Sequence, residues 1–400
     1  MSDNSNKNKR IVKNTVFLYI RMALVLVVSL YTSKVILNTL GVQDYGIYNI
    51  VAGFVSMFGF LNASITACIQ RYYNYEIGRN GDDGLGRVFT MSCLIECIIA
   101  FVVLLLLETF GVWYINNKLV VPDYKLFAAN ILFQLSCIQM TLVMFQAPFS
   151  GAILAKEKMD YYAAVGIIDV FLKLLIVIIL PYLLYDSLIV FGCLMTFISI
   201  VDFFLYYIYA KREFAKLRLL RFWDCELFKS MLSFSGWNVF GAVAMVARTQ
   251  GLNLILNLFF GPVVNAARGV SIQVQGALMG FIGNISMAVR PQIVESYAIG
   301  NINRSRDIMF SISKICFLFL FIMALPVCLN IDIILKFWLG DKVPEYTNVF
   351  SVLILCTALI DTLNTPITML IMATGKVKKY CLYTSICGLL VLPVAYFFYF

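Results

Sequence analysis

The sequence predicts an all-α polytopic membrane protein made of two parallel-repeat bundles of about six helices each. Three observations support this fold class. Of the 400 residues, 61% are hydrophobic and 13% are charged, whereas soluble domains carry about 25% charged residues. The hydrophobic residues gather in runs of roughly 20, the length at which a helix crosses the hydrocarbon core of a bilayer. The second half of the chain also repeats polar positions of the first half at a constant spacing.

The hydrophobic runs define eleven predicted membrane spans. The polar and basic N-terminus, residues 1–13, leads into the first apolar run. A cleavable signal peptide has a shorter apolar region and a small-residue cleavage site, so we expect this run to be an uncleaved first span. The predicted spans are 14–38, 46–70, 88–110, 125–148, 163–185, 187–209, 231–256, 266–289, 309–330, 347–372 and 379–400.

The internal repeat covers the connections that follow the second and eighth spans. Asn38, at the end of the first span, likewise recurs as Asn257. Each copy is expected to hold six spans, an even number, so both copies have the same orientation in the membrane. The repeated positions are 219 residues apart (290 − 71) and pair Arg71, Glu76, Gly81, Arg87 and Ser92 with Arg290, Glu295, Gly300, Arg306 and Ser311.

The repeat predicts three parts of the chain. They are an N-terminal transmembrane bundle at 1–210, a basic cytoplasmic linker at 211–230 and a C-terminal transmembrane bundle at 231–400. The first copy ends near Tyr209, so the second copy is expected to end near 428 (209 + 219). Because Phe400 lies inside an apolar run, we expect a twelfth span to be missing from the sequence.

Basic residues alternate between the two sides of the predicted spans. One side holds the basic N-terminal tail and the basic connections after even-numbered spans, and the other side holds four lysines. The positive-inside rule places the basic side, and with it the N-terminus, in the cytoplasm. The same rule accounts for the basic joint between the halves. The four lysines are Lys118, Lys125, Lys336 and Lys342.

The composition also excludes several kinds of site. The chain has no His, the usual proton shuttle and the commonest metal ligand. Its 11 Cys lie almost all in apolar runs without a CxxC pair, which indicates buried hydrophobes rather than disulfides or metal ligands. The longest predicted outer loop, 111–125, has one acid, Asp123, and no catalytic motif. We therefore expect no enzyme activity, no cofactor, no metal and no nucleic-acid partner.

Three stretches of the sequence form recognisable motifs. They are Leu37–Tyr48 (LNTLGVQDYGIY), Gly261–Gly269 (GPVVNAARG) and Arg290–Glu295 (RPQIVE). These stretches resemble bacterial polysaccharide flippases of the O-antigen (Wzx-like) type, within the multidrug, oligosaccharidyl-lipid and polysaccharide exporter superfamily. In the family, the first stretch is the first outer loop. Members usually have twelve or fourteen spans, so eleven is a departure at the C-terminal edge.

The resemblance implies a V-shaped pair of six-helix bundles in the bacterial plasma membrane, with spans 1, 2, 7 and 8 lining a central cavity. The cargo would be an oligosaccharide on a polyprenyl diphosphate lipid, moved to the outer leaflet for O-antigen and lipopolysaccharide synthesis. Glycosyltransferases and a polysaccharide polymerase would be partner enzymes.

Cations inside spans are costly, by about 2.5–3.5 kcal/mol on insertion scales, so they usually face protein or water. Arg248 lies near the middle of span 7, beside a polar stripe that contains Asn253. In span 8, Arg268 and Gln275 share a polar face, and span 1 carries Arg21. Arginine offers planar charged donors that match a diphosphate. We therefore predict substrate contacts at Arg21, Arg248, Asn253, Arg268, Gln275 and, with an interfacial alternative, Lys34.

Intramembrane acids suggest a coupling site for H⁺ or Na⁺. Asp169 and Lys173 are four residues apart on span 5, and an internal ion pair is the favoured interpretation. Asp361 shares a face of span 10 with three threonines, Thr357, Thr365 and Thr368, near Pro366. Such oxygens could hold a proton or Na⁺, and a buried acid bonded to a neighbouring helix is the alternative. Glu96 and Asp202 are weaker candidates.

Three functions are compatible with these features. The first is a flippase for lipid-linked oligosaccharide, and the second is a cation-coupled multidrug-type exporter of small molecules. Multidrug pumps that move organic cations favour acidic cavities, whereas Arg21, Arg248 and Arg268 are basic. The third, a membrane glycosyltransferase or polymerase, would need a catalytic aqueous loop that the sequence does not contain. The sequence therefore favours the flippase.

Overall fold

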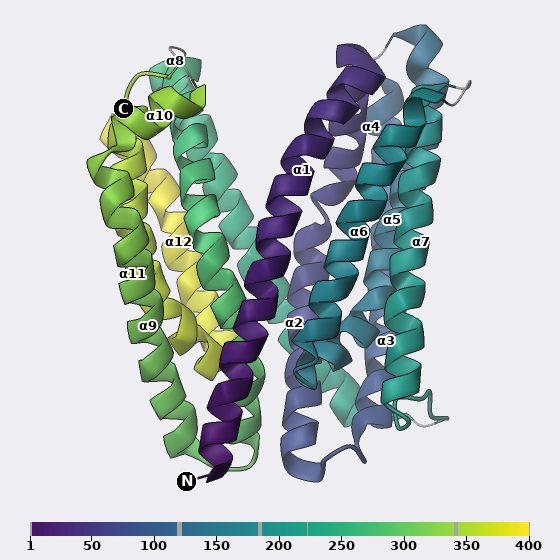
Figure 1. Cartoon of the computed structure of the whole chain (residues 1–400), viewed down its shortest axis with the longest axis vertical. Coiled ribbons are helices and arrows are strands. Elements are labelled where there is room, and N and C mark those ends of the chain that lie inside the picture. Colours follow the sequence, from purple (N-terminus) through teal and green to yellow (C-terminus); the bar gives the residue numbers. More distant parts are fainter. Residues whose placement is uncertain (1, 118–121, 183–185, 222, 340–342, 400) are drawn as a thin grey trace. The chain divides into compact units, whose positions relative to one another are not determined.

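The protein is a multi-pass helical membrane protein. The computed structural model describes residues 2–117, 122–182, 186–221, 223–339 and 343–399, and some side chains within these ranges, including that of Lys34, are outside the description. Every regular element in these ranges is helical, so the all-α prediction is confirmed. The helices, drawn in Figure 1, are α1 (Ser2–Ser56), α2 (Gly59–Asn80), α3 (Leu85–Leu106), η1 (Leu107–Gly111), α4 (Val112–Asn117), α5 (Asp123–Ala155), α6 (Met159–Ile179), η2 (Leu180–Tyr182), α7 (Ser187–Glu213), α8 (Cys225–Ala298), α9 (Ile302–Leu329), α10 (Ile331–Leu339), α11 (Thr347–Thr374) and α12 (Lys378–Tyr399).

Ten helical segments of the described chain are long and apolar enough to cross a membrane. They correspond in order to the second through eleventh predicted spans. The predicted first span lies within α1, where several side chains are outside the description, and it stays a prediction. The ten segments are Gly46–Asn80, Leu85–Asn117, Tyr124–Ala155, Met159–Ile179, Ser187–Glu213, Cys225–Phe260, Ala266–Ala298, Ile302–Leu329, Thr347–Thr374 and Lys378–Phe398.

The backbone is helical where loops were expected after the first and seventh spans. The expected loop near 38–46 lies inside α1, and the expected loop near 257–265 lies inside α8. A straight helix of the 74 residues of α8 would be about 111 Å long, far more than the roughly 30 Å of a hydrocarbon core. If both limbs span the membrane, α8 therefore turns back near its middle.

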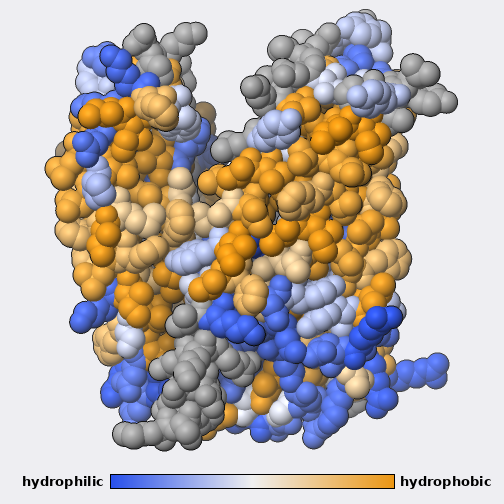
Figure 2. Space-filling view, viewed as in Figure 1, coloured by the Kyte–Doolittle hydropathy of each residue, from blue (hydrophilic) through white to orange (hydrophobic). Residues whose placement is uncertain are grey.

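The chain divides into two compact units, Met1–Ser233 (unit 1) and Phe234–Phe400 (unit 2). The division falls inside α8, because the first residues of α8 pack against unit 1. The bundles predicted at 1–210 and 231–400, the linker predicted at 211–230 and the repeat that relates the two bundles all stay predictions. In Figure 2, hydrophobic side chains cover the middle of each unit and hydrophilic side chains gather at the ends, as expected for helices that cross a bilayer.

In unit 1, α5 packs against α1, α2, α3 and α7, and α6 packs against α1 and α7. The buried side chains around α5 include Leu132 and Phe133, which lie among hydrophobic residues of α1, α3 and α7. Gly192 of α7 allows this contact, because an added Cβ would lie 3.0 Å from the methyl groups of Leu132 and Leu135. The close approach of α5 and α7 therefore depends on a missing side chain.

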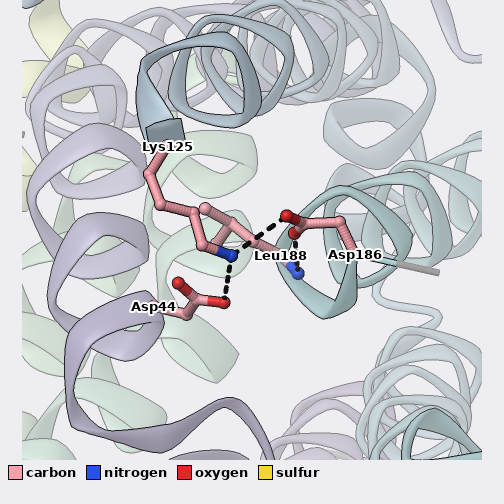
Figure 3. A network of polar contacts seen from close by, with 4 residues as sticks. All are labelled: Asp44, Lys125, Asp186 and Leu188. Carbon is pink, nitrogen blue, oxygen red and sulfur yellow. Dashed lines mark hydrogen bonds and ion pairs between the residues drawn. The ribbon is translucent and has the colours of Figure 1, made fainter. Parts of the chain in front are cut away.

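A charged cluster joins α1, α5 and α7 at one end of unit 1 (Figure 3). The Lys125 ammonium donates to Asp44 at 2.9 Å and to Asp186 at 3.0 Å. Asp186 also caps α7 by accepting the backbone N–H of Leu188 at 3.0 Å. Burial alone would raise the pKa of Asp186, but the bonds from Lys125 and Leu188 outweigh it and lower that pKa. Asp44 belongs to the stretch that resembles a flippase loop, so the cluster gives this residue a structural role.

We predict that Lys125→Met lowers the melting temperature of the purified protein. The change leaves two carboxylates without their ammonium partner, and we expect a loss of about 1–2 kcal/mol, as for hydrogen bonds to charged groups. Because the folded-state pKa of Asp186 lies below the ordinary 3.8, this contribution is fully present above that pH and is lost as the pH falls below it.

The measurement compares the melting temperatures of the wild type and Lys125→Met between pH 3 and 8. Lys336→Met is the control, because Lys336 is an exposed cation of α10 with no ion pair among the described contacts. Equal melting temperatures for the wild type and Lys125→Met at neutral pH would contradict the stabilising role of the cluster.

Candidate functional site

In unit 2, the two limbs of α8 bring two arginines close together. Arg248 is on the first limb and Arg268 is on the second. The Arg268 guanidinium donates a hydrogen bond to the side-chain oxygen of Asn253, and the positive charge of Arg248 also acts on Arg268. Asn253 in turn donates to Gln250 at 3.1 Å. Three of the predicted substrate residues therefore form one half-buried group.

The Arg248 side chain lies against α12. An added Cβ at Gly388 would lie 3.6 Å from Cδ of Arg248, so glycine at this position leaves room for the arginine. The ion pairs described in the chain involve other cations, and none joins a carboxylate to Arg248 or Arg268. Two like charges without a described counter-ion, inside membrane-spanning helices, form a group that an anion would stabilise.

No described hydrogen bond joins Gln275, another predicted substrate residue, to the group formed by Arg248, Arg268 and Asn253. Gln275 follows Arg268 by seven residues, which places both on one face of the second limb of α8, and it is half-buried. Ser271, from the same predicted stripe, instead bonds the backbone oxygen of Thr347 at 3.1 Å and the hydroxyl of Ser351 at 3.0 Å, so it packs against α11. Lys34 lies in α1, but its side chain is outside the described residues.

Unit 1 places Arg21 at an interface of α1, α6 and α7. The Arg21 guanidinium lies 4.8 Å from the centre of the Tyr162 ring, and it passes directly over Gly166 of α6. Its Nε is buried and has no hydrogen-bond partner among the described residues. The charge of Arg21 also acts on the buried Tyr206 of α7. Stacking on an aromatic ring stabilises a partly desolvated guanidinium.

Two of the three predicted coupling residues, Asp169 and Lys173, lie at the same interface. Lys173 donates to Asp169 at 2.8 Å, so the predicted internal ion pair is present on α6. Asp202 of α7 lies next to Asp169, close enough for a side-chain hydrogen bond, and it also acts on Tyr206. Arg21, predicted to bind substrate, therefore lies in the same group of side chains as Asp169 and Lys173, predicted for coupling, with Tyr206 and Asp202 between them. The place of Asp202 in this group could not be predicted from the sequence, because no spacing rule predicts contacts between residues on different helices.

Glu96 of α3 is the most isolated acid of unit 1. Its exposed fraction is 0%, and both carboxylate oxygens lack a hydrogen-bond partner among the described residues. A carboxyl group in this position is far more stable with a proton than as an unpaired charge.

Asp361 is exposed on α11 of unit 2. The predicted threonine neighbours use their hydroxyl protons locally. Thr365 donates to the backbone oxygen of Asp361 at 3.0 Å, and Thr357 donates to that of Ile354 at 2.7 Å. Thr368 lies 2.8 Å from the hydroxyl of Tyr380 on α12. An ion site at Asp361 stays a prediction. No cluster of three or more His, Cys, Asp or Glu suited to a metal ion occurs in the described part of the chain.

No protein-family model matches the sequence, and no curated protein matches it. Among solved structures, 31 chains are similar. One is an outward-facing multidrug resistance MATE family transporter of the MOP superfamily, with a TM-score of 0.78, 14% identity, 98% of this chain covered and 88% of that chain. A MATE in complex with MaD3S gives a TM-score of 0.72 and 13% identity, with 98% and 97% covered.

A third similar structure is a MOP superfamily transporter from Pyrococcus furiosus, with a TM-score of 0.70, 13% identity, 98% of this chain covered and 95% of that chain. These similar structures are transporters rather than enzymes. At 13–14% identity, the comparison shows that this chain has the fold of MOP superfamily transporters.

We predict that Gly166→Ala destabilises the protein by displacing Arg21 from its position over Gly166. Alanine normally favours a helix over glycine by about 0.5–1 kcal/mol, so the sign of the effect is informative. In an Arg21→Ala background the same Gly166→Ala change should become stabilising. Gly276→Ala is the control, because an added Cβ there meets no atom within 4 Å.

The measurement is a double-mutant cycle on the melting temperatures of the wild type, Gly166→Ala, Arg21→Ala and the protein with both changes. Additive effects of Gly166→Ala and Arg21→Ala would show that the two residues are not in contact.

Proposed function

We propose that the protein exports an anionic amphiphile, a polyprenyl-diphosphate-linked oligosaccharide, across the bacterial plasma membrane for surface polysaccharide synthesis. The observation that supports this proposal is the pairing of Arg248 with Arg268 in unit 2 without a described carboxylate partner. A diphosphate carries about two negative charges and several acceptor oxygens, which match two guanidinium groups. Asn253 adds an amide at the same place, suited to sugar hydroxyls or phosphate.

The fold supports transport. Parallel repeats of membrane helices are a common architecture of transporters, in which the site is open alternately to each side of the membrane. The similar structures are transporters of the MOP superfamily. A cationic, hydrated site would offset the cost of moving a diphosphate through a medium of low dielectric constant. The central cavity implied by the sequence resemblance is part of this proposal.

The second candidate is a cation-coupled exporter of small organic molecules. The similar structure with the TM-score of 0.78 is a multidrug resistance transporter, which favours this candidate at the level of the fold. Organic cations, however, would be repelled by Arg248 and Arg268. For the Pyrococcus furiosus transporter, the reverse polarity of its binding pocket is described as suggesting a different function. Binding pockets of different polarity can therefore occur on one fold, and the local charge of this chain favours an anion.

Energy for transport would come from an H⁺ or Na⁺ gradient acting at Asp169, Asp202 and Lys173. The group has two adjacent carboxyls and one lysine. It is anionic when both carboxyls are ionised and neutral when one of them binds a proton, so its charge reports proton binding. Asp361 is a second candidate in unit 2. The proposal also includes a cytoplasmic N-terminus, from the positive-inside rule, and glycosyltransferases and a polysaccharide polymerase as partner enzymes.

We predict that Arg248→Gln and Arg268→Gln each reduce flipping of a polyprenyl-diphosphate sugar at least tenfold in reconstituted vesicles. Each change removes a charge-assisted contact to the diphosphate. Lys314→Gln, which removes an exposed cation of α9, should leave the rate unchanged. Normal flipping in both arginine variants would refute the proposed cargo site, and transport of an organic cation instead would establish the second candidate.

We predict that Asp202→Asn makes flipping independent of the imposed proton gradient, because it removes one of the two adjacent carboxyls that exchange the proton. The rate is measured with and without a pH or Na⁺ gradient. Undiminished flipping by the wild type after both gradients are collapsed would eliminate ion coupling while leaving the cargo proposal intact.

A further inference from the structure

The connection between α7 and α8 is fixed to unit 1; we call its described residues, 214–221, 223 and 224, the strap. Phe214 and Leu217 are buried, and the backbone N–H of Leu220 donates to the Thr90 hydroxyl of α3 at 2.9 Å. Gly86 of α3 permits this approach, since an added Cβ would lie 3.1 Å from the backbone oxygen of Lys216. The strap is therefore a packed element of unit 1.

Ion pairs set the orientation of the strap. Arg87 of α3 pairs with Asp224 at 2.6 Å, and Lys216 pairs with Asp83. The backbone N–H of Leu227 donates to Asp224, and this bond together with Arg87 lowers the pKa of Asp224. These contacts hold one side of the strap against α3 and leave the opposite side facing outward.

The outward side combines apolar and cationic side chains. Leu219 is 67% exposed and Trp223 is 58% exposed, and both are flanked by exposed arginines, Arg218 and Arg221. We call these four residues the strap face. Burying a large apolar side chain is favourable, so an exposed Leu and an exposed Trp four residues apart in the strap indicate contact with something other than water.

The positive charge of this region is not neutralised by nearby acids. Asp83 pairs with Lys216, Asp224 pairs with Arg87, and Glu213 pairs with Lys158. Glu226 is the remaining acid between residues 211 and 229. Five cations of this region have no ion pair among the described contacts: Lys211, Arg212, Arg218, Arg221 and Lys229.

The strap connects two helical segments that are long and apolar enough to cross a membrane, Ser187–Glu213 and Cys225–Phe260. A short connection between two consecutive spans lies at the surface of the membrane. Trp is typical of the interface between headgroups and hydrocarbon, where its ring is partly buried. Cations immediately next to a membrane span attract negatively charged lipid headgroups. The apolar Trp223 and Leu219 match the boundary between headgroups and hydrocarbon, and the arginines without a described ion pair match the negatively charged headgroups.

We propose that the strap face binds anionic phospholipids of the leaflet that it adjoins. Trp223 and Leu219 insert at the headgroup boundary, and Arg218 and Arg221 bind the lipid phosphates. The strap thereby anchors unit 1 to the bilayer. This site lies outside the membrane spans and does not depend on the identity of the exported cargo.

The test uses the full-length protein with Trp223 as its one remaining tryptophan, after Trp113→Phe, Trp237→Phe and Trp338→Phe. The protein is reconstituted into phosphatidylcholine bilayers with a fixed fraction of phosphatidylglycerol. Bromine atoms, which quench tryptophan fluorescence, are placed on either one lipid or the other. We expect quenching of Trp223 to be several-fold stronger per brominated lipid when the bromines are on phosphatidylglycerol.

Arg218→Gln with Arg221→Gln should abolish that preference, and high salt should weaken it. A matched protein that keeps Trp338 of α10 as its one tryptophan controls for general effects, because its quenching should not respond to either arginine change. Melting temperatures confirm that the variants are folded. Equal quenching by the two brominated lipids would overturn the proposal, as would an absence of quenching by both.

Discussion

The cost of placing a charge in hydrocarbon is the constraint on which this structure depends. A charged side chain within a membrane span must meet an opposite charge, a hydrogen-bonding group, an aromatic face or water. Unit 1 meets this requirement internally at two places. Lys125 joins two aspartates of different helices, and Lys173 pairs with Asp169 while Arg21 stacks on Tyr162. These contacts hold the same helices that the apolar core packs together.

Unit 2 differs, because two charges within its membrane helices, those of Arg248 and Arg268, have no described partner of opposite charge. Arg248 and Arg268 are brought together by the two limbs of one helix, and the described contact of Arg268 is with a neutral amide, Asn253. A like-charge pair is unfavourable unless an anion or water completes it. The contrast between the units is informative, because Arg248 and Arg268 have no charged counterpart 219 residues earlier, where the chain has Ser29 and Asn49. The proposed cargo site and the proposed coupling site follow from this difference in charge.

The joint between the units shows how tertiary contacts change the meaning of a basic loop. By charge alone, the loop satisfies the positive-inside rule and needs no further explanation. In the structure, Asp83 and Asp224 take part in ion pairs that fix the strap to α3, and the cations that remain lie on its outward side. The division of the chain then falls within α8 after this fixed segment. The ion pairs therefore fix which side chains of this basic connection are exposed.

The sequence by itself determined the helical class, ten of the spans and the pairing of Asp169 with Lys173, because hydrophobic length and the helical spacing of four residues are local properties. It could not determine contacts between helices. The adjacency of Asp202 to Asp169, the stacking of Arg21 on Tyr162 and the Lys125 cluster join residues far apart in the chain. Only tertiary packing decides which faces meet. The helical backbone at the expected loops in α1 and α8 was likewise not predicted from the sequence.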